Sequence, residues 1–250
     1  MSIEKSELKW SYTPADFFEA SYRRKSSNYS LVADAGKVVV TLQTPVDPVD
    51  AVLRARIAAD VEGLFKLRQL QIHRPFELAG PTIYQHHPGA GKSVSIATGS
   101  VSALAFVGQV DFVVRDASGA IKQDSKAERI AEHTKFLDSV MAKGATSARL
   151  RILLDSYGAA VRDAGNELVH LYEIRDALAE HYGGEESARV ALGITKKEWQ
   201  RLGVLANVEP LKEGRHRGKH HSGSRSASPS ELEEVRDNVR RWIASFAEKE

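Results

Sequence analysis

The chain has 250 residues, of which 42% are hydrophobic and 27% charged, as in soluble globular proteins that bury a core. Its 35 Lys and Arg nearly balance its 33 Asp and Glu, so the net charge of +2 identifies no partner and any basic function must be local. The lack of cysteine excludes disulfides, thiolate metal sites and cysteine nucleophiles, and no run approaches the ~18 apolar residues of a membrane span. The first ten residues, MSIEKSELKW, lack the apolar core of a signal peptide, which favours a cytoplasmic protein.

The first half, residues 1–124, predicts a mixed domain of β-hairpins and one helix. The segment LKWSY alternates as a half-buried strand does. Two longer β-rich runs predict hairpins, one turning at Asp34–Lys37 and the other at Asp116–Gly119. Between them an Asp47-Pro48 start signal precedes residues at helical spacing, namely Val52, Leu53, Ile57, Val61, Leu64 and either Leu67 or Arg68.

Two motifs in this half suggest sites that their surroundings do not support. Pro88–Ser93, PGAGKS, is similar to a phosphate-binding loop, but the position of its first glycine is occupied by His86 and the next residues favour a strand over a helix. His86 and His87 could form half of a metal site, but no carboxylate follows at a suitable spacing. We therefore expect a turn, and no metal or cofactor.

The second half, residues 125–250, predicts an all-helical bundle of four to five helices, which makes the whole chain α+β. Three segments fit the capping box that begins a helix, with pairs Ser125/Glu128, Thr195/Glu198 and Ser228/Glu231. Apolar stripes follow, the last of them formed by Leu232, Val235, Val239, Trp242, Ile243 and Phe246. Helices with one apolar stripe must pack on each other, which is why a bundle is expected.

The segment 188–206 within this half is similar to the helix-turn-helix of DNA-binding proteins. A turn at Gly193 and a cap at Thr195 separate two short helical patterns. In a DNA-binding regulator the groove-facing residues would be Lys196, Lys197, Gln200 and Arg201. The same pattern also makes a tight corner in any bundle, and Glu185, Glu186 and Glu198 would oppose a phosphate backbone.

A basic stretch precedes the last helix: LKEGRHRGKHHSGSR, residues 211–225, holds five Lys or Arg, three His and one acid. Histidine suits proton transfer because its pKa lies near neutrality. Arginine suits phosphate because its planar fork meets two oxygens and keeps its charge. The residue types therefore indicate a site at which a phosphodiester is held and a proton is moved.

Arg215, His216 and His220 reproduce the short Arg-polar-x3-His motif, and the helical half resembles the HEPN-domain ribonucleases. That resemblance implies a metal-independent endoribonuclease, often a toxin or antiviral effector, whose site is assembled across a homodimer on RNA. Arg215 would hold phosphate, His220 would be the general acid or base, and His216 would be the polar second residue. The flanking residues expected to bind RNA phosphates are Lys212, Arg217, Lys219, His221 and Arg225, and Glu173 or Asp176 could add an acid from a preceding helix.

Other interpretations stay open at this point. Arg68 with His73, and Arg175 with His181, have a similar spacing, and the second pair lies in a helical pattern with acidic neighbours. The glycines at 214, 218 and 223 indicate a loop, which is costly to order for catalysis. The helices could also serve a non-catalytic interaction module, with the basic stretch as a solvated connector.

Overall fold

The computed structural model describes residues 4–44, 49–87, 90–95, 111–116, 118–143, 147–215 and 224–250. They form an α+β protein of two compact units, as the sequence predicts in class. Unit 1 comprises residues 1–68 and 76–145, and unit 2 comprises residues 69–75 and 146–250. The sequence placed the boundary at 124/125, whereas here the helix that follows Asp124 groups with the first unit.

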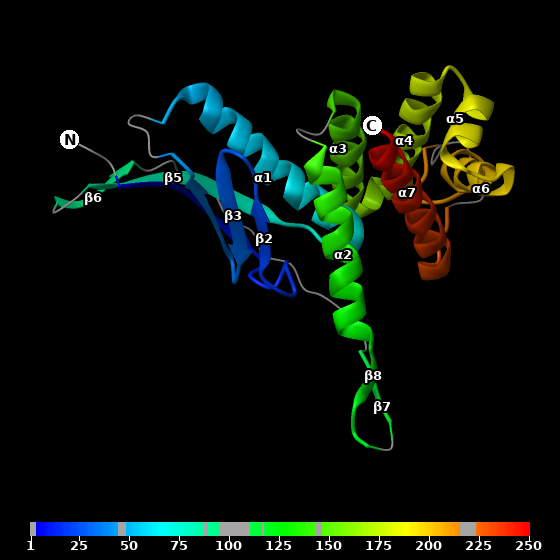
Figure 1. Ribbon diagram of the computed structural model, residues 1–250. Coiled ribbons are helices and arrows are strands. Elements are labelled where there is room, and N and C mark those ends of the chain that lie inside the picture. The colour runs from blue at the N-terminus through cyan, green and yellow to red at the C-terminus, as the bar shows by residue number, and fades with distance from the viewer. Residues whose placement is uncertain are drawn as a thin grey trace. The chain divides into compact units, whose positions relative to one another are not determined.

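Unit 1 is built on a fully antiparallel sheet with strand order β2-β3-β4-β1-β5-β6 (Figure 1). Its strands are β1 Lys5–Thr13, β2 Tyr22–Lys25, β3 Tyr29–Asp34, β4 Lys37–Leu42, β5 Glu77–His87 and β6 Ala90–Ser95. The hairpin predicted at Asp34–Lys37 is confirmed, with Ala35 and Gly36 at φ 44° and 80° in its two-residue turn. Residues 90–93 of the PGAGKS segment lie in strand β6, so this segment does not lead into a helix as a phosphate-binding loop does.

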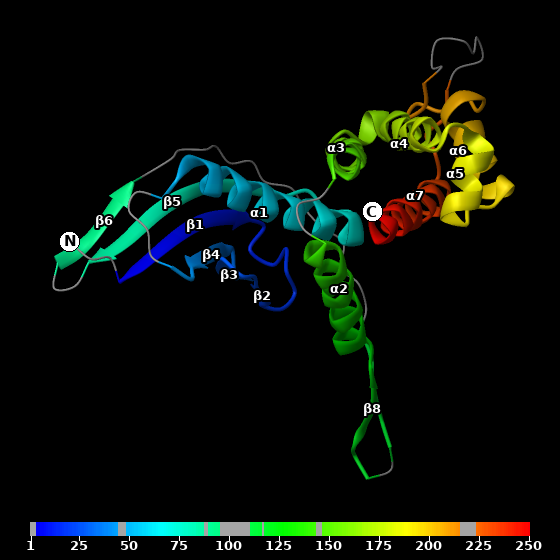
Figure 2. The same ribbon diagram turned by 45° about the horizontal axis from the view of Figure 1, so that its top comes forward.

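Helix α1, Ala51–Ile72, lies along one face of this sheet (Figure 2). Ile57, Val61 and Leu64 are fully buried on its inner side, as their spacing predicts. The inclusion of Val52 in that stripe was wrong, because the buried face begins later in the helix and Val52 is 75% exposed in the first turn. Only residues 51–68 belong to unit 1, and the last turn of the helix packs in unit 2.

The second predicted hairpin is formed by β7, Val113–Arg115, and β8, Ile121–Asp124, and it leads into α2, Ser125–Ala142. The predicted capping box at Ser125 was wrong by one residue. Asp124 is the N-cap, and its carboxylate accepts the Ala127 N–H at 3.0 Å. The Ser125 hydroxyl instead accepts the N–H of Phe112 at 2.9 Å, because the hairpin brings that strand back to the helix start.

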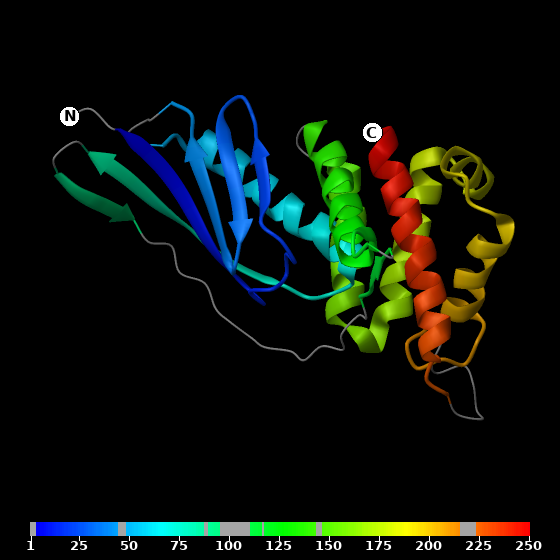
Figure 3. The ribbon, with the colours of Figure 1, turned by 60° about the horizontal axis from the view of Figure 1, so that its bottom comes forward.

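Unit 2 is a helical bundle (Figure 3). In its described residues the last turn of α1 packs with α3 Ala148–Arg162, α4 Glu167–Tyr182, α5 Glu185–Leu192, α6 Lys196–Asn207 and α7 Pro229–Lys249. The capping boxes at Thr195 and Ser228 are confirmed. Trp199 and Trp242 stack with ring centroids 5.4 Å apart in the core. Among the described helices none combines the length and the hydropathy needed to cross a bilayer.

Candidate functional site

The stretch after α6 fixes the backbone of Arg215. Leu211 is 1% exposed, and Gly214 is buried against the end of α6. A Cβ at Gly214 would lie only 3.1 Å from the Ala206 carbonyl oxygen. The Arg215 N–H donates to that same carbonyl at 2.7 Å. Gly214 is therefore a packing glycine, and the chain on this side of the basic stretch is anchored rather than loose.

The guanidinium of Arg215 reaches α4, where it meets an aromatic ring and an acid. Its central carbon lies 4.9 Å from the ring centroid of Tyr172, and its Nη1 lies 3.8 Å from Asp176 Oδ2. Tyr172 and Asp176 are four residues apart and share one side of α4. These three residues are the Arg215 cluster.

The ion pair in the Arg215 cluster is loose, which leaves donors for a ligand. The side chains of Arg215 and Asp176 are 44% and 58% exposed, and at 3.8 Å their attraction in water is small. Partial burial raises the pKa of the Asp176 carboxyl, and the nearby Arg175 and Arg215 oppose that rise. The cluster thus offers a planar cation that is positioned by its backbone and by an aromatic ring and is nearly half exposed to solvent.

The two ends of the basic stretch are hydrogen-bonded to each other. Lys212 N–H donates to the Arg225 carbonyl at 2.9 Å, and Arg225 N–H donates to the Pro210 carbonyl at 3.0 Å. His216, Arg217, Lys219, His220 and His221 lie outside the described residues. The chain that carries them therefore starts and finishes at a closed base, next to the Arg215 cluster.

The two predicted phosphate contacts inside the described residues differ sharply. Lys212 is exposed. Arg225 donates from Nη1 and Nη2 to the carboxylate of Glu231 at 2.7 and 2.8 Å, and it lies 3.6 Å from Glu209. These contacts raise the pKa of Arg225 and lower that of Glu231 to about 2. The fork of Arg225 is thus occupied in holding the start of α7.

Of the predicted auxiliary residues and the rival Arg–His pair, only Asp176 contacts Arg215. Of the two candidate acids on α4, Asp176 faces Arg215, whereas Glu173 lies 3.4 Å from His170. Arg175 and His181 do not converge. The guanidinium of Arg175 packs over the rings of Tyr172 and Trp199 and lies 3.4 Å from Glu185, while His181 packs on Tyr182 and Phe246.

Arg68 and His73 do not form a common site either, because Arg68 belongs to unit 1 and His73 to unit 2. Arg68, 4% exposed, donates to the Phe17 carbonyl and Glu19 and lies 2.7 Å from His133 Nδ1, all in unit 1. Burial, helped by the charge of Arg68, lowers the pKa of His133 to about 4. These groups saturate each other, so they are a structural cluster.

The helix-turn-helix geometry is present in the segment 188–206. Gly193, at φ 68°, ends α5, and Thr195 caps α6 two residues later. Lys196, Lys197 and Gln200 are exposed along α6, and Val204 continues the same side with 37% exposure. Arg201 instead pairs with Glu234 at 3.0 Å and Glu231 at 3.6 Å. The other three predicted groove contacts are exposed, and within the described residues none of them forms an ion pair with an acid.

Sequence reasoning missed the role of Tyr172 and a buried network in unit 2. The only local signal for Tyr172 was its spacing of four from Asp176. In the network, Glu167 is 1% exposed and accepts two hydrogen bonds from Arg236, at 2.5 and 2.7 Å. His73 lies 2.9 Å from the Tyr157 hydroxyl and 3.6 Å from Glu167. These groups join the residue after α1 to α3, α4 and α7, and Glu167 and Tyr157 at their centre are buried, so they hold the bundle together.

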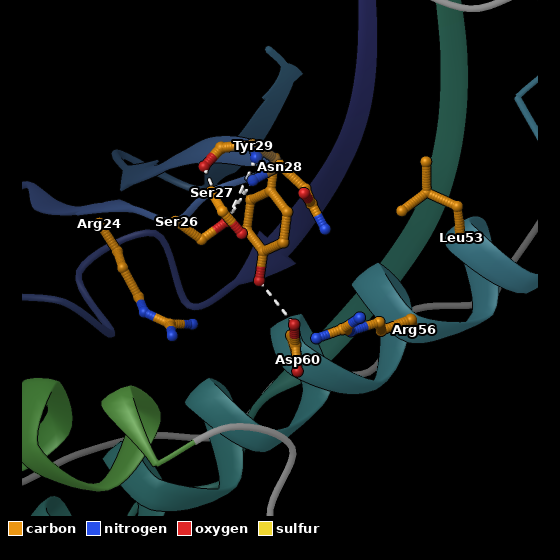
Figure 4. Close-up of a pocket in the computed structure, with 8 residues that line it drawn as sticks. All are labelled: Arg24, Ser26, Ser27, Asn28, Tyr29, Leu53, Arg56 and Asp60. Carbon is orange, nitrogen blue, oxygen red and sulfur yellow. Dashed lines mark hydrogen bonds between the residues drawn. The ribbon is translucent and has the colours of Figure 1, made fainter. Parts of the chain in front are cut away.

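A small pocket in unit 1 lies between the β2–β3 turn and α1 (Figure 4). Arg24 and Arg56 point toward it, and the Tyr29 hydroxyl donates to Asp60 at 2.6 Å. Its volume of about 50 Å³ suits a few water molecules rather than a nucleotide. Arg24 also donates to the Met141 carbonyl, so this pocket is part of the packing of unit 1.

The residues in the described ranges contain no group of three or more side chains that could hold a metal ion. His86 lies 3.3 Å from Glu7, a carboxylate that the sequence spacing did not suggest, but no third ligand joins them within those ranges. Comparison of the chain with protein-family models, with curated proteins and with solved structures gives no match.

Proposed function

We propose that this protein is a metal-independent endoribonuclease of the HEPN type that acts as a homodimer on single-stranded RNA. The single observation that carries the proposal is the placement of Arg215. Its backbone is fixed against α6, and its guanidinium lies over Tyr172 and beside Asp176, at the base of the stretch that holds His220. A half-exposed guanidinium in such a setting suits a phosphate, which it can meet with two parallel N–H groups.

The proposed reaction is a transesterification within RNA. The 2′-oxygen attacks the adjacent phosphorus and loses its proton to a base, the bond from phosphorus to the 5′-oxygen breaks, and that oxygen receives a proton from an acid. His220 serves as the acid or base, because imidazole exchanges protons near neutral pH. Arg215 stabilises the negative charge that builds on the phosphoryl oxygens.

Asp176 and Tyr172 are positioning residues in this scheme. Asp176 holds the guanidinium from the side of α4 without saturating it, because the contact is long and solvated. The ring of Tyr172 packs against the guanidinium of Arg215 and holds it by a cation–π contact. A homodimer would present two copies of the basic stretch to one RNA, and a role in defence or as a toxin fits such an activity.

The test is cleavage of a fluorescent single-stranded RNA by the full chain in the presence of a chelator. His220→Ala should slow cleavage by about 100-fold or more, which is the contribution of a general acid or base. Arg215→Ala should do the same, and Arg215→Lys should recover only part of the rate because the planar fork is lost. His170→Ala, at a partly exposed histidine of α4, and Arg151→Ala, at an exposed arginine of α3, are matched controls and should cleave as the parent does. Equal rates for the parent and His220→Ala, or no cleavage by the parent, would overturn the proposal.

A DNA-binding regulator is the second candidate, and the exposed edge of α6 favours it. Lys196, Lys197 and Gln200 occupy the start of the second helix of the α5–α6 pair, which is the part that reads base edges in such motifs. This function predicts duplex binding that weakens steeply with salt, is lost in Lys196→Glu/Lys197→Glu, and survives in His220→Ala. If Lys196→Glu/Lys197→Glu binds duplex DNA with the affinity of the parent, the DNA-binding function is excluded.

A further inference from the structure

The face of the unit 1 sheet that points away from α1 carries a concentration of cations. Alternate residues of a strand point to opposite faces, and the strand register decides which residues share one. Glu7, Lys9 and Ser11 of β1 pair with Thr41, Val39 and Lys37 of β4, and Thr41 and Val39 in turn pair with Ser30 and Val32 of β3. On β2, Lys25 pairs with Ser30 and Arg23 pairs with Val32, so both belong to this face. With Lys5 at the start of β1, the cations of this face are Lys5, Lys9, Arg23, Lys25 and Lys37.

This set of residues, with Glu7, Asp34, Glu77, Tyr84 and the hydroxyl residues between them, is the outer sheet face. Figure 2 shows α1 lying over the opposite side, and no helix of the described chain in unit 1 lies over the outer sheet face. Arg23 and Lys9 are three strands apart, about 14 Å at the usual strand spacing. The cations therefore spread across the sheet instead of gathering at one edge.

The charge of the outer sheet face is only partly compensated. Glu7 is 5% exposed and is bound by Lys5 at 2.5 Å and Lys9 at 2.9 Å, with His86 at 3.3 Å. Burial opposes the ionisation of Glu7, but these hydrogen bonds prevail and lower its pKa to about 2. Within the described ranges Arg23, Lys25 and Lys37 make no ion pair with an acid. Two further acids share this face, since the register places Asp34 opposite Lys37 and Glu77 opposite Thr13. Five cations thus face three carboxylates, and the excess of positive charge lies toward Arg23 and Lys25 on β2.

The rest of the outer sheet face suits nucleic acid better than a protein partner. Between the cations lie Ser11, Ser30, Thr41 and Thr82, and the apolar members Val32 and Val39 are only partly exposed. Protein interfaces need a desolvated apolar centre, whereas nucleic-acid interfaces are polar and strongly positive. Tyr84 adds an aromatic ring beside Lys9, whose Nζ lies 4.5 Å from its centroid.

We propose that the outer sheet face binds single-stranded RNA, with Arg23, Lys25, Lys9 and Lys37 on phosphates and Tyr84 on a base. A broad sheet face admits a splayed strand, whose bases can lie on aromatic rings, and it cannot enter a duplex groove as a helix or two-stranded ribbon does. The choice of RNA rests on the proposed function. The binding itself rests on the strand register and the charges alone.

The experiment measures the affinity of the full chain, carrying His220→Ala to prevent cleavage, for a fluorescent 20-nucleotide single-stranded RNA at several salt concentrations. The test variant adds Arg23→Glu/Lys25→Glu, two exposed residues of an edge strand. The matched control adds Arg54→Glu/Arg56→Glu, two exposed residues of α1 that change the net charge equally but face away. The test variant should weaken binding at least ~10-fold and flatten the slope of log K against log salt by about 1.4, the loss of two phosphate contacts to a single strand.

Each of the following results would overturn the inference. One is an equal loss of affinity in the test and control variants, which indicates non-specific attraction to net charge. The other is an affinity for a duplex of the same length that equals the affinity for the single strand, or no measurable affinity for either. The proposed function fails separately: the parent chain then binds RNA without cutting it, while the Arg23→Glu/Lys25→Glu effect persists. Arg23→Glu/Lys25→Glu is also made in the parent chain, with His220 intact. If that chain cleaves RNA with an unchanged KM, the nuclease proposal stands and RNA binding by the outer sheet face is refuted.

Discussion

Removing Arg236 should destabilise unit 2 far more than removing any exposed arginine of the same helix. Arg236, on α7, donates two short hydrogen bonds to Glu167, whose side chain is 2% exposed at the start of α4. In Arg236→Leu that carboxylate stays buried without its guanidinium. Breaking a buried pair in this way costs about 3–5 kcal/mol, a large share of the ~5–15 kcal/mol that holds a domain folded.

The matched control is Arg241→Leu, five residues further along α7. Arg241 is 58% exposed and contacts Glu198 at 2.8 Å, so its loss should cost about 1 kcal/mol or less. Removing both buried charges in Glu167→Met/Arg236→Met should restore most of the stability, because two apolar side chains leave no unpaired charge.

Urea unfolding followed by tryptophan fluorescence measures these free energies. Trp199 and Trp242 are both buried in unit 2 and stack on each other. The third tryptophan, Trp10, is buried in unit 1, so the series is made in a Trp10→Phe background in which the emission reports the packing of unit 2. If Arg236→Leu lowers the free energy of unfolding no more than Arg241→Leu does, Glu167 has found other solvation and the assigned role of the pair is wrong.

Two further predictions concern His73 and Gly214. Burial, helped by Arg236 and Arg240, lowers the pKa of His73 to about 3, so its neutral form stabilises the fold above pH 6.5 and that stability is lost as the pH falls toward 3. Between pH 6.5 and 5 the free energy of unfolding should fall by about 2 kcal/mol. His73→Asn should flatten this dependence on pH, because asparagine tolerates the local φ of 47° and does not titrate. An equally steep profile in the variant contradicts this. Gly214→Ala should lower the melting temperature and displace Arg215, because the added Cβ meets the Ala206 carbonyl at 3.1 Å, whereas Gly165→Ala, with 3.7 Å to its nearest neighbour, should change little.

The sequence predicted those parts of the fold that depend on neighbours along the chain. The helix over Ile57, Val61 and Leu64, the hairpin turning at Ala35–Gly36 and the caps at Thr195 and Ser228 all follow from local patterns. The cap at Asp124 was missed because two adjacent residues could each cap α2, and the choice depends on Phe112, which the hairpin returns to Ser125. The grouping of α2 with the sheet is likewise a long-range outcome that no spacing encodes.

The candidate site was predictable in its chemistry and not in its contacts. The residue types around Arg215 indicated phosphate. Glu173 and Asp176 were equally good candidates from the sequence, and only the direction of the α4 side chains places Asp176 by Arg215. Nor could it separate Lys212 from Arg225, since the fork of Arg225 is occupied by an acid six residues later. Contacts between helices depend on how they pack, and packing is not written in a short motif.

Helix α4 links the stability of unit 2 to the candidate site. Its buried first residue, Glu167, is fixed by α7, and nine residues later, about 13.5 Å along the axis, Asp176 lies beside Arg215. An α-helix is stiff over this length. The contact at Glu167 therefore fixes the position along the helix axis at which Tyr172 and Asp176 contact the Arg215 guanidinium. Arg236 therefore acts on the Arg215 cluster without contacting it. A variant that loosens the anchor should disturb phosphate binding together with stability, whereas Arg215→Ala should impair binding and leave the unfolding free energy of unit 2 nearly unchanged.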